Sequence, residues 1–538
     1  MLRYTFNLFL WGLLALLFIQ CAKRGNPTGG PEDEIPPVLL RAVPELNSTG
    51  FSENRIRLYF DEYVKLEKLK DQLIVSPPLD PATYIISPQS TASKYVQIEL
   101  MDSLQANTTY NFNFGQSIVD NNEGNPYPYF RYVFSTGGYV DSLQVSGTIG
   151  NAFGREAKSF VSVMLYAVDS TYNDSIIYKR HPDYITNTLD SLAIFEIDNV
   201  RAGRYLLIAQ KDIANNYTFD QSADDIAFID DFVEIPTDSL FHFDLFREQT
   251  DFSLGRIFQA GQNRIGVGYF GKPNSLKILP LNLPESVQTV QSFDKDKDTL
   301  YFWYKNLKAD SLQFEISQDT LKVQLTHQIR KAEVDSLTIS PNISGVLHLT
   351  DTLRVETSTP ISTVDKTKIN LFNRDSIAVP FDIYVEDPHR VLFDFDILPN
   401  ENYRFDILPG AITDFFNISN DSLKMQLRTQ KPSDYGSLYL QLVGVPSYPI
   451  IVQLTDEKEN LVRSSTITAP QRRVVFSNLQ PKKYYVRLII DENSNGKWDS
   501  GNFLKRRLPE KVFHHKPLLD VRANWELQEK FSVTENPF

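Results

Sequence analysis

Oxygen-bearing side chains recur at regular spacing in one stretch near the carboxyl terminus, DENSNGKWD from position 491 to 499. The oxygens fall at its first, third, fifth, seventh (a backbone carbonyl) and ninth positions, which are Asp491, Asn493, Asn495, Lys497 and Asp499. Ca²⁺ prefers carboxylate, amide and carbonyl oxygens as ligands. Gly496, at the sixth position, permits the sharp turn that brings such ligands together. The stretch therefore predicts a weak Ca²⁺ site.

The spacing is similar to the first nine positions of an EF-hand loop, which ends on a bidentate Glu at the twelfth position. Here the twelfth residue is Asn502, so high affinity is not expected. The alternative is a turn in which Asp and Asn cap their own backbone, and both interpretations stay open. A second stretch, Asp212–Asp220, keeps two acids at the same separation but lacks the glycine, and we interpret it as a turn.

Other patterns that could carry chemistry favour structural interpretations. Gly266-x-Gly268-x-x-Gly271 matches a dinucleotide-binding pattern, but Lys-Pro-Asn follows where a helix would have to begin. The histidines are scattered except for His514 and His515, which stand among basic residues and predict a solvated strand edge rather than a metal site. We therefore predict that the chain is not an enzyme and requires no cofactor, with Ca²⁺ as an optional ion.

The amino terminus contains the clearest targeting signal of the chain. A short apolar run, Thr5–Gln20, follows a single basic residue and stops at Cys21, the only cysteine of the chain. The run falls below the ~20 apolar residues that a membrane span needs. This layout is typical of a secretory signal peptide.

The same stretch resembles a bacterial lipoprotein signal, in which the cysteine becomes the lipidated first residue of the mature protein. The resemblance implies a signal peptide at 1–20, lipidation at Cys21 and a tether at 21–37, which is rich in Gly, Pro and charge. It also implies a lipid anchor in the outer membrane, on the periplasmic face or at the cell surface. The partner at this end is then the membrane itself, through the lipid.

Composition predicts an all-β protein of several domains. The chain has 538 residues, 12% aromatic residues and only 4 Met, and its apolar runs are short and alternating. Ile56, Leu58 and Phe60 show the alternation, whereas Val64–Leu73 has the spacing of a short helix. A net charge of -13 argues against nucleic acid as a partner.

Residues 38–137 end on a recognisable motif. Asp120 precedes Gly124-Asn125, and a strand then ends at Phe134-Ser135-Thr136. This pattern resembles the SbsA-type bacterial Ig-like domain first described in S-layer proteins. The resemblance implies a β-sandwich in which the Asp and the Gly-Asn shape a loop and are not catalytic.

Residues 142–248 contain the turn Asn199-Val-x-Ala-Gly-x-Tyr205, which resembles transthyretin-like domains of the carboxypeptidase-regulatory type. Asn478 and Tyr484 repeat the spacing of this turn, and the stretch around Tyr403 repeats that around Tyr110, with Leu398 placed where Leu104 stands. Internal repetition predicts that modules recur in the same order. The predicted domains after the first are transthyretin-like 142–248, an unassigned sandwich 249–332, Ig-like 333–430 and transthyretin-like 434–532.

The fold class expected is therefore an elongated array of tandem β-sandwiches behind a lipoprotein signal. The function expected is a non-catalytic envelope lipoprotein that acts as a multi-domain binding scaffold. Similar modules accompany outer-membrane β-barrel machines for transport, secretion or barrel assembly, so the expected partner is such a barrel or another envelope protein. A glycan-binding surface lipoprotein is the alternative, and an enzyme with an unrecognised site is the second alternative.

Overall fold

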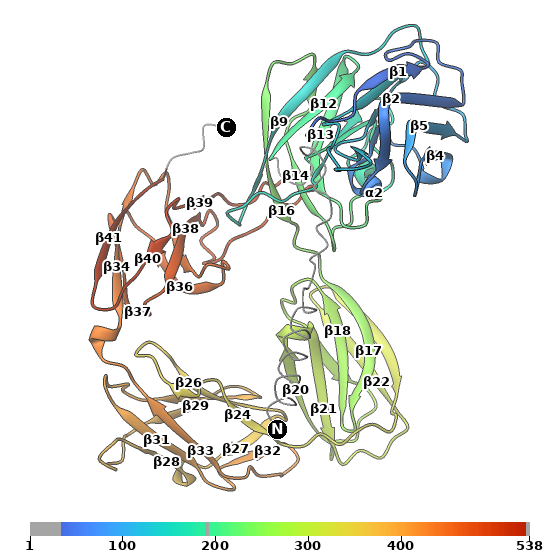
Figure 1. Cartoon of the computed structure of the whole chain (residues 1–538). Coiled ribbons are helices and arrows are strands. Elements are labelled where there is room, and N and C mark those ends of the chain that lie inside the picture. The colour runs from blue at the N-terminus through green and yellow to red at the C-terminus, as the bar shows by residue number, and fades with distance from the viewer. Residues whose placement is uncertain (1–33, 189–192, 534–538) are drawn as a thin grey trace, which may run out of the picture. The chain divides into compact units, whose positions relative to one another are not determined.

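The computed structural model describes residues 34–188 and 193–533 (Figure 1). Cys21, the predicted signal peptide 1–20 and the tether up to residue 33 lie outside the described residues. The described residues divide into two compact units, one within Met1–Ser142 together with Asn199–Arg201, and one within Leu143–Asp198 together with Ala202–Phe538. Strands dominate both units, as the composition predicts. In the described ranges, no helix has the length and apolar character needed to cross a membrane.

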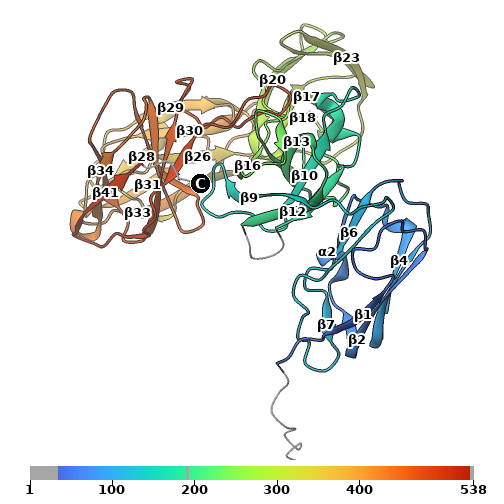
Figure 2. The same cartoon turned by 90° about the horizontal axis from the view of Figure 1, so that it is seen from above.

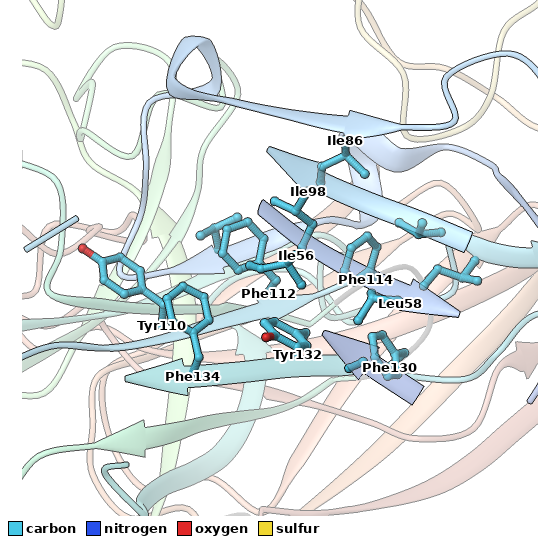
Figure 3. Packing of buried hydrophobic residues seen from close by; sticks show 14 of the residues in the cluster. Ile56, Leu58, Ile86, Ile98, Tyr110, Phe112, Phe114, Phe130, Tyr132 and Phe134 are labelled. Carbon is cyan, nitrogen blue, oxygen red and sulfur yellow. The ribbon is translucent and has the colours of Figure 1, made fainter. Parts of the chain in front are cut away.

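The first sandwich consists of two facing sheets, seen in blue in Figure 2. One sheet has the order β1 (Leu39–Val43), β2 (Arg55–Leu66), β5 (Ser93–Leu100) and β4 (Tyr84–Ser87), with β7 (Ile118–Asp120) also paired to β2. The other has the order β3 (Ile74–Ser76), β6 (Thr109–Asn113) and β8 (Arg131–Ser135). Ile56 and Leu58 are fully buried, and they face aromatic side chains such as Phe112 and Phe134 between the sheets (Figure 3).

The helix predicted for Val64–Leu73 is wrong over most of its length. The structure has only a single helical turn, α2 (Leu69–Gln72). Val64 belongs to β2, where it is fully buried and pairs with Asp120 of β7. A β-branched residue favours a strand, and burial between sheets outweighs the helical spacing of its neighbours.

The second sandwich is one continuous sheet with the order β11–β10–β13–β14–β16–β9–β12, and β15 also pairs with β13. Its strands are β9 (Leu143–Asn151), β10 (Ser162–Ala167), β11 (Tyr184–Asn187), β12 (Ile194–Val200), β13 (Gly203–Lys211), β14 (Asp225–Phe228), β15 (Val233–Ile235) and β16 (Leu240–Arg247). The pair β9 and β16 is parallel, whereas β10, β14 and β15 run antiparallel to β13.

The last sandwich repeats these pairings except that of β14 with β16, so its strands form two sheets. Its strands are β34 (Gly436–Val443), β35 (Ile450–Thr455), β36 (Leu461–Ile467), β37 (Arg473–Leu479), β38 (Lys483–Ile490), β39 (Val512–His514), β40 (Leu519–Asp520) and β41 (Glu526–Ser532). The first and last strands are again parallel, and the central β38 pairs with β35, β39 and β40 as β13 pairs with β10, β14 and β15. Asn199 and Asn478 both adopt a left-handed backbone, with φ of 60° and 53°. The repeated spacing thus reflects the same turn in both copies.

The sandwich that precedes it has the same pairing as the first one. Its strands are β24 (Ile339–Pro341), β25 (Gly345–Val346), β26 (Leu353–Thr357), β27 (Ile361–Val364), β28 (Ile369–Phe372), β29 (Asp382–Asp387), β30 (Arg390–Asp394), β31 (Asn402–Ile407), β32 (Ile412–Asp414) and β33 (Leu423–Arg428). β26 and β27 together take the place of the single long β2, since β26 pairs with β24 and β30 while β27 pairs with β32.

A hydrogen bond that both copies contain fixes their alignment. The Tyr110 hydroxyl accepts a 3.0 Å hydrogen bond from the Gln105 N–H, and the Tyr403 hydroxyl accepts one of 2.8 Å from the Leu398 N–H. Leu398 therefore corresponds to Gln105, one residue away from the predicted Leu104.

The middle sandwich has sheets of order β17 (Ser253–Gly261), β18 (Arg264–Phe270), β21 (Thr299–Lys305) and β20 (Gln288–Asp294), and β19 (Lys277–Pro280), β22 (Ser311–Gln318) and β23 (Leu321–Gln328). The Gly266–Gly271 pattern lies on β18 and the turn after it, as predicted. The ring of the buried Trp303 of this sandwich lies 5.5 Å from that of His389 at an angle of 47°, and it clusters with Phe415; both residues belong to the next sandwich.

Candidate functional site

The predicted Ca²⁺ stretch is the first part of a long loop between β38 and β39. Both oxygens of Asp491 accept backbone hydrogen bonds, Oδ1 from Asn495 at 3.0 Å and Oδ2 from Gly496 at 2.9 Å. The side-chain amides of Asn493 and Asn495 both donate to Oδ2 of Asp499. The structure thus brings the predicted side chains together, and donors within the loop already satisfy them, as in an Asx-rich turn.

Glu510, at the end of the same loop, was not singled out by sequence. It is buried, and its carboxylate accepts hydrogen bonds from the backbone N–H groups of Glu492 at 2.9 Å and Asp499 at 3.0 Å. Burial raises the pKa of the Glu510 carboxyl, and these two N–H groups partly offset the effect. Glu510 therefore fastens both ends of the Asp491–Asp499 turn.

The rest of this loop packs on the second sandwich, within the second unit. Phe503 is fully buried, its ring lies 5.3 Å from that of Phe228, and its N–H donates to the Glu248 carboxylate. A 2.7 Å hydrogen bond from Arg155 to the His515 carbonyl adds to the contact. The loop joins two sandwiches that are more than two hundred residues apart in sequence.

The corresponding loop of the second sandwich, between β13 and β14, uses the same anchor. Asp224 accepts hydrogen bonds from the N–H groups of Ile213 and Asp220, both at 2.9 Å, as Glu510 does from Glu492 and Asp499. Oδ2 of Asp212 accepts from the Tyr217 N–H at 2.7 Å. Asp212 and Asp224 therefore correspond to Asp491 and Glu510.

The histidine pair differs from its prediction. His515 is buried rather than solvated, and His514 lies on β39 with its side chain partly covered. Burial, with Arg155 and Arg487 nearby, lowers the pKa of His514 to about 4. The histidine is therefore neutral at neutral pH. The reason is that residues far away in sequence cover the pair: the backbone of Phe153 and Gly154 contacts His514, and the Phe531 ring lies 5.3 Å from that of His515.

One arrangement of nucleophile, base and acid occurs on the exposed face of the second sandwich. Thr148 Oγ1 lies 2.7 Å from His242 Nδ1, and His242 Nε2 lies 3.2 Å from Asp244 Oδ1. The Asp244 hydrogen bond raises the His242 pKa despite partial burial. Asp244 is on the same strand as the histidine and half exposed, so water competes for each contact. We interpret the group as a cross-strand polar cluster.

The carboxylate of Asp120 holds the loop that follows it, as the sequence predicts. Oδ1 of Asp120 accepts hydrogen bonds from the N–H groups of Asn122, Glu123 and Gly124, and Oδ2 accepts from Asn125. Burial alone would raise the Asp120 pKa, but these donors hold it below its usual value. In the described residues, no group of three or more His, Cys, Asp or Glu side chains is placed to hold a metal.

Comparison with known proteins supports the Ig-like assignment of the first sandwich. The family described as bacterial Ig-like domain matches residues 33–136. No curated protein matches the chain. Solved structures similar to the chain include the S-layer protein rSbsC (11% identity, 90% of this chain, 67% of that chain, TM-score 0.15). They also include the major pilin subunit BcpA of Bacillus cereus (10% identity, 73% of this chain, 99% of that chain, TM-score 0.14). The human desmocollin-1 ectodomain is a third example (11% identity, 86% of this chain, 95% of that chain, TM-score 0.15).

The predicted fold class is confirmed as tandem β-sandwiches, and the first of them is Ig-like. This assignment rests on the family match and on the strand pairings. The transthyretin-like resemblance and the lipidation of Cys21 stay predictions.

Proposed function

We propose that this chain is a non-catalytic lipoprotein of the cell envelope, anchored through Cys21, whose sandwiches form a binding scaffold for another envelope protein. An outer-membrane β-barrel complex is the partner we favour. The stretch that resembles a lipoprotein signal supports a location in the cell envelope. The tandem sandwiches support a binding role.

The observation that carries the proposal is the presence of apolar edge strands. Among the described residues, β29 pairs only with β30, and β36 only with β35. Each edge exposes large apolar side chains: Tyr384 and Val385 are 52% and 53% exposed on β29, and Leu461 is 55% exposed on β36. An exposed edge with apolar side chains can accept a strand from a partner.

Site-specific photo-crosslinking in cells tests this surface. A photoreactive amino acid in place of Val385 should capture one discrete partner, whereas the same group in place of Asp394 should not. Asp394 is a matched control because it is exposed on β30, which is paired on both sides. Equal crosslinking from Val385 and Asp394 would show that these edge strands are not the binding surface. The same conclusion would follow if neither Val385 nor Leu461 gave a crosslink.

A separate experiment tests the anchor. Cys21→Ser should leave an unprocessed or released protein that no longer incorporates labelled fatty acid. If the variant is labelled and fractionates with the outer membrane as the native protein does, the lipoprotein part of the proposal is wrong.

The glycan-binding alternative depends on one exposed aromatic. Trp525 is 59% exposed, with the Arg522 guanidinium 5.5 Å from its ring. An exposed indole can stack on a sugar ring. Retention on a polysaccharide column that is lost in Trp525→Ala would favour this alternative over the scaffold.

A further inference from the structure

Two buried acceptor oxygens at one end of β13 have no hydrogen-bond donor. They are Oε1 of Gln210, whose side chain is fully buried, and Oδ1 of Asp212, which is 6% exposed. Buried polar atoms in folded proteins nearly always have a partner. Two such oxygens on residues only two positions apart therefore point to a positively charged or donating ligand.

The backbone brings these oxygens to one place. Gln210 and Asp212 are separated by one residue along an extended segment, so their side chains leave the same face. The Gln210 amide nitrogen donates to Oδ2 of Asp224 and to the Thr218 carbonyl, both at 2.9 Å. These two bonds fix the amide orientation, because turning it over would point its oxygen at two acceptors.

The charges at this end of the sandwich are unbalanced. Asp212 and Asp224 are both buried, with 6% and 1% of their surface exposed. The neighbouring Asp225 is different, because Lys158 and Arg247 both form ion pairs with it. In the described ranges, no Lys or Arg forms an ion pair with Asp212 or Asp224.

We propose that Gln210 Oε1 and Asp212 Oδ1 are ligands of a buried hard divalent cation of the Ca²⁺ type, and that the Asp224 carboxylate, whose oxygens already accept hydrogen bonds, adds negative charge beside it. The two free ligands are an amide oxygen and a carboxylate oxygen, and such ligands suit Ca²⁺ rather than a metal that prefers nitrogen or sulfur. The site lies in the loop that the sequence pattern predicted only as a turn. It is distinct from the Asp491–Asp499 turn, whose first carboxylate is already satisfied.

Thermal unfolding of the full mature chain with Ca²⁺ and with chelator tests the site. The background is Asp491→Asn, which removes any contribution from the other loop. In this background we expect the midpoint to rise with Ca²⁺, because a ligand of the folded state adds RT ln(1 + [L]/Kd). Asp212→Asn in addition should abolish the rise without lowering the midpoint in chelator, since an amide donor can satisfy Gln210 Oε1. Equal midpoints with and without millimolar Ca²⁺, or a rise that survives Asp212→Asn, would overturn the proposal.

The variant Gln210→Glu tests whether the species between these oxygens is a cation rather than a buried water or a shared proton. A third carboxylate should lower the midpoint in chelator and tighten Ca²⁺ binding roughly tenfold, because the added charge faces the cation. Isothermal titration of the same variants with CaCl₂ measures the affinity. If Ca²⁺ neither rescues Gln210→Glu nor binds it more tightly, the two oxygens do not form a cation site.

Discussion

The loop between β13 and β14 and the loop between β38 and β39 follow the corresponding central strand of two similar sandwiches, yet the two loops make different contacts. Both fasten their turn with one buried carboxylate, Asp224 or Glu510. The first loop leaves Asp212 Oδ1 without a donor, whereas the second satisfies both oxygens of Asp491 and extends Phe503 onto another sandwich. The number of oxygens in a motif thus says less about ion binding than the number of backbone donors that already engage them.

The largest effect is expected at the docked end of the second loop. Phe503→Ala should lower the free energy of unfolding by about 3–5 kcal/mol, because it empties a fully buried aromatic site beside Phe228. Leu504→Ala is the matched control, since Leu504 is 53% exposed and should cost less than about 0.5 kcal/mol. Urea unfolding of the whole chain measures both. Equal losses would mean that the loop does not dock as described.

The shared anchor predicts matching costs in the two loops. Glu510→Ala and Asp224→Ala each leave two backbone N–H groups without their acceptor, so each should destabilise the chain by about 1–3 kcal/mol. Hydrogen exchange of the freed amides locates the change. A loss of protection at Glu492 and Asp499 without a counterpart at Ile213 and Asp220 would break the equivalence of the loops.

Substitution of two glycines in the β38–β39 loop distinguishes packing of the loop on the second sandwich from formation of the Asp491–Asp499 turn. A Cβ on Gly501 would lie 2.5 Å from the Phe246 ring, so Gly501→Ala should push the loop off the second sandwich at a cost of about 1–3 kcal/mol. Gly496 has φ of +75° and open space around it, so Gly496→Ala should cost only about 1 kcal/mol, through backbone strain. Limited proteolysis should cut the loop faster in the first variant. Faster cutting in the second would place the constraint in the turn instead.

A smaller, pH-dependent effect is expected at Glu248, which the second loop covers. Burial raises the pKa of this carboxyl, and the Phe503 N–H and Gln221 only partly offset it. A raised folded pKa favours the proton in the folded state, so the contribution is complete below the unfolded pKa of about 4.3 and is lost as pH rises through the folded value. The stability of the native chain relative to Glu248→Gln should therefore fall as pH rises above about 4, by less than about 1.4 kcal/mol per unit of pKa shift. Parallel pH profiles of the two proteins would contradict this.

Sequence patterns predicted the fold well where burial follows a simple period. Ile56 and Leu58 alternate as expected, and the spacing from Asn478 to Tyr484 identified a real structural repeat. The helical spacing of Val64–Leu73 misled because β7 pairs with that part of β2, a contact that depends on residues far along the chain. Long-range pairing is not encoded in a local window.

The candidate site was harder to predict for a related reason. Asp491–Asp499 is visible because its oxygens are close in sequence, but Gln210 looks like any polar residue in a strand until its burial is known. Asp224 and Glu510 stand at different distances from their turns, so no fixed spacing marks them. Hydrogen-bond satisfaction, which separates the two loops, follows from the folded backbone alone.

The central claim is that this protein works by holding a partner in the envelope, and one measurement tests it most directly. Affinity purification of the native chain from membranes in mild detergent should recover an outer-membrane β-barrel protein at near-equal stoichiometry, with recovery weakened by degrees when single sandwiches are deleted. Recovery of the chain alone, together with retained binding to a polysaccharide column, would contradict the scaffold proposal and favour glycan binding.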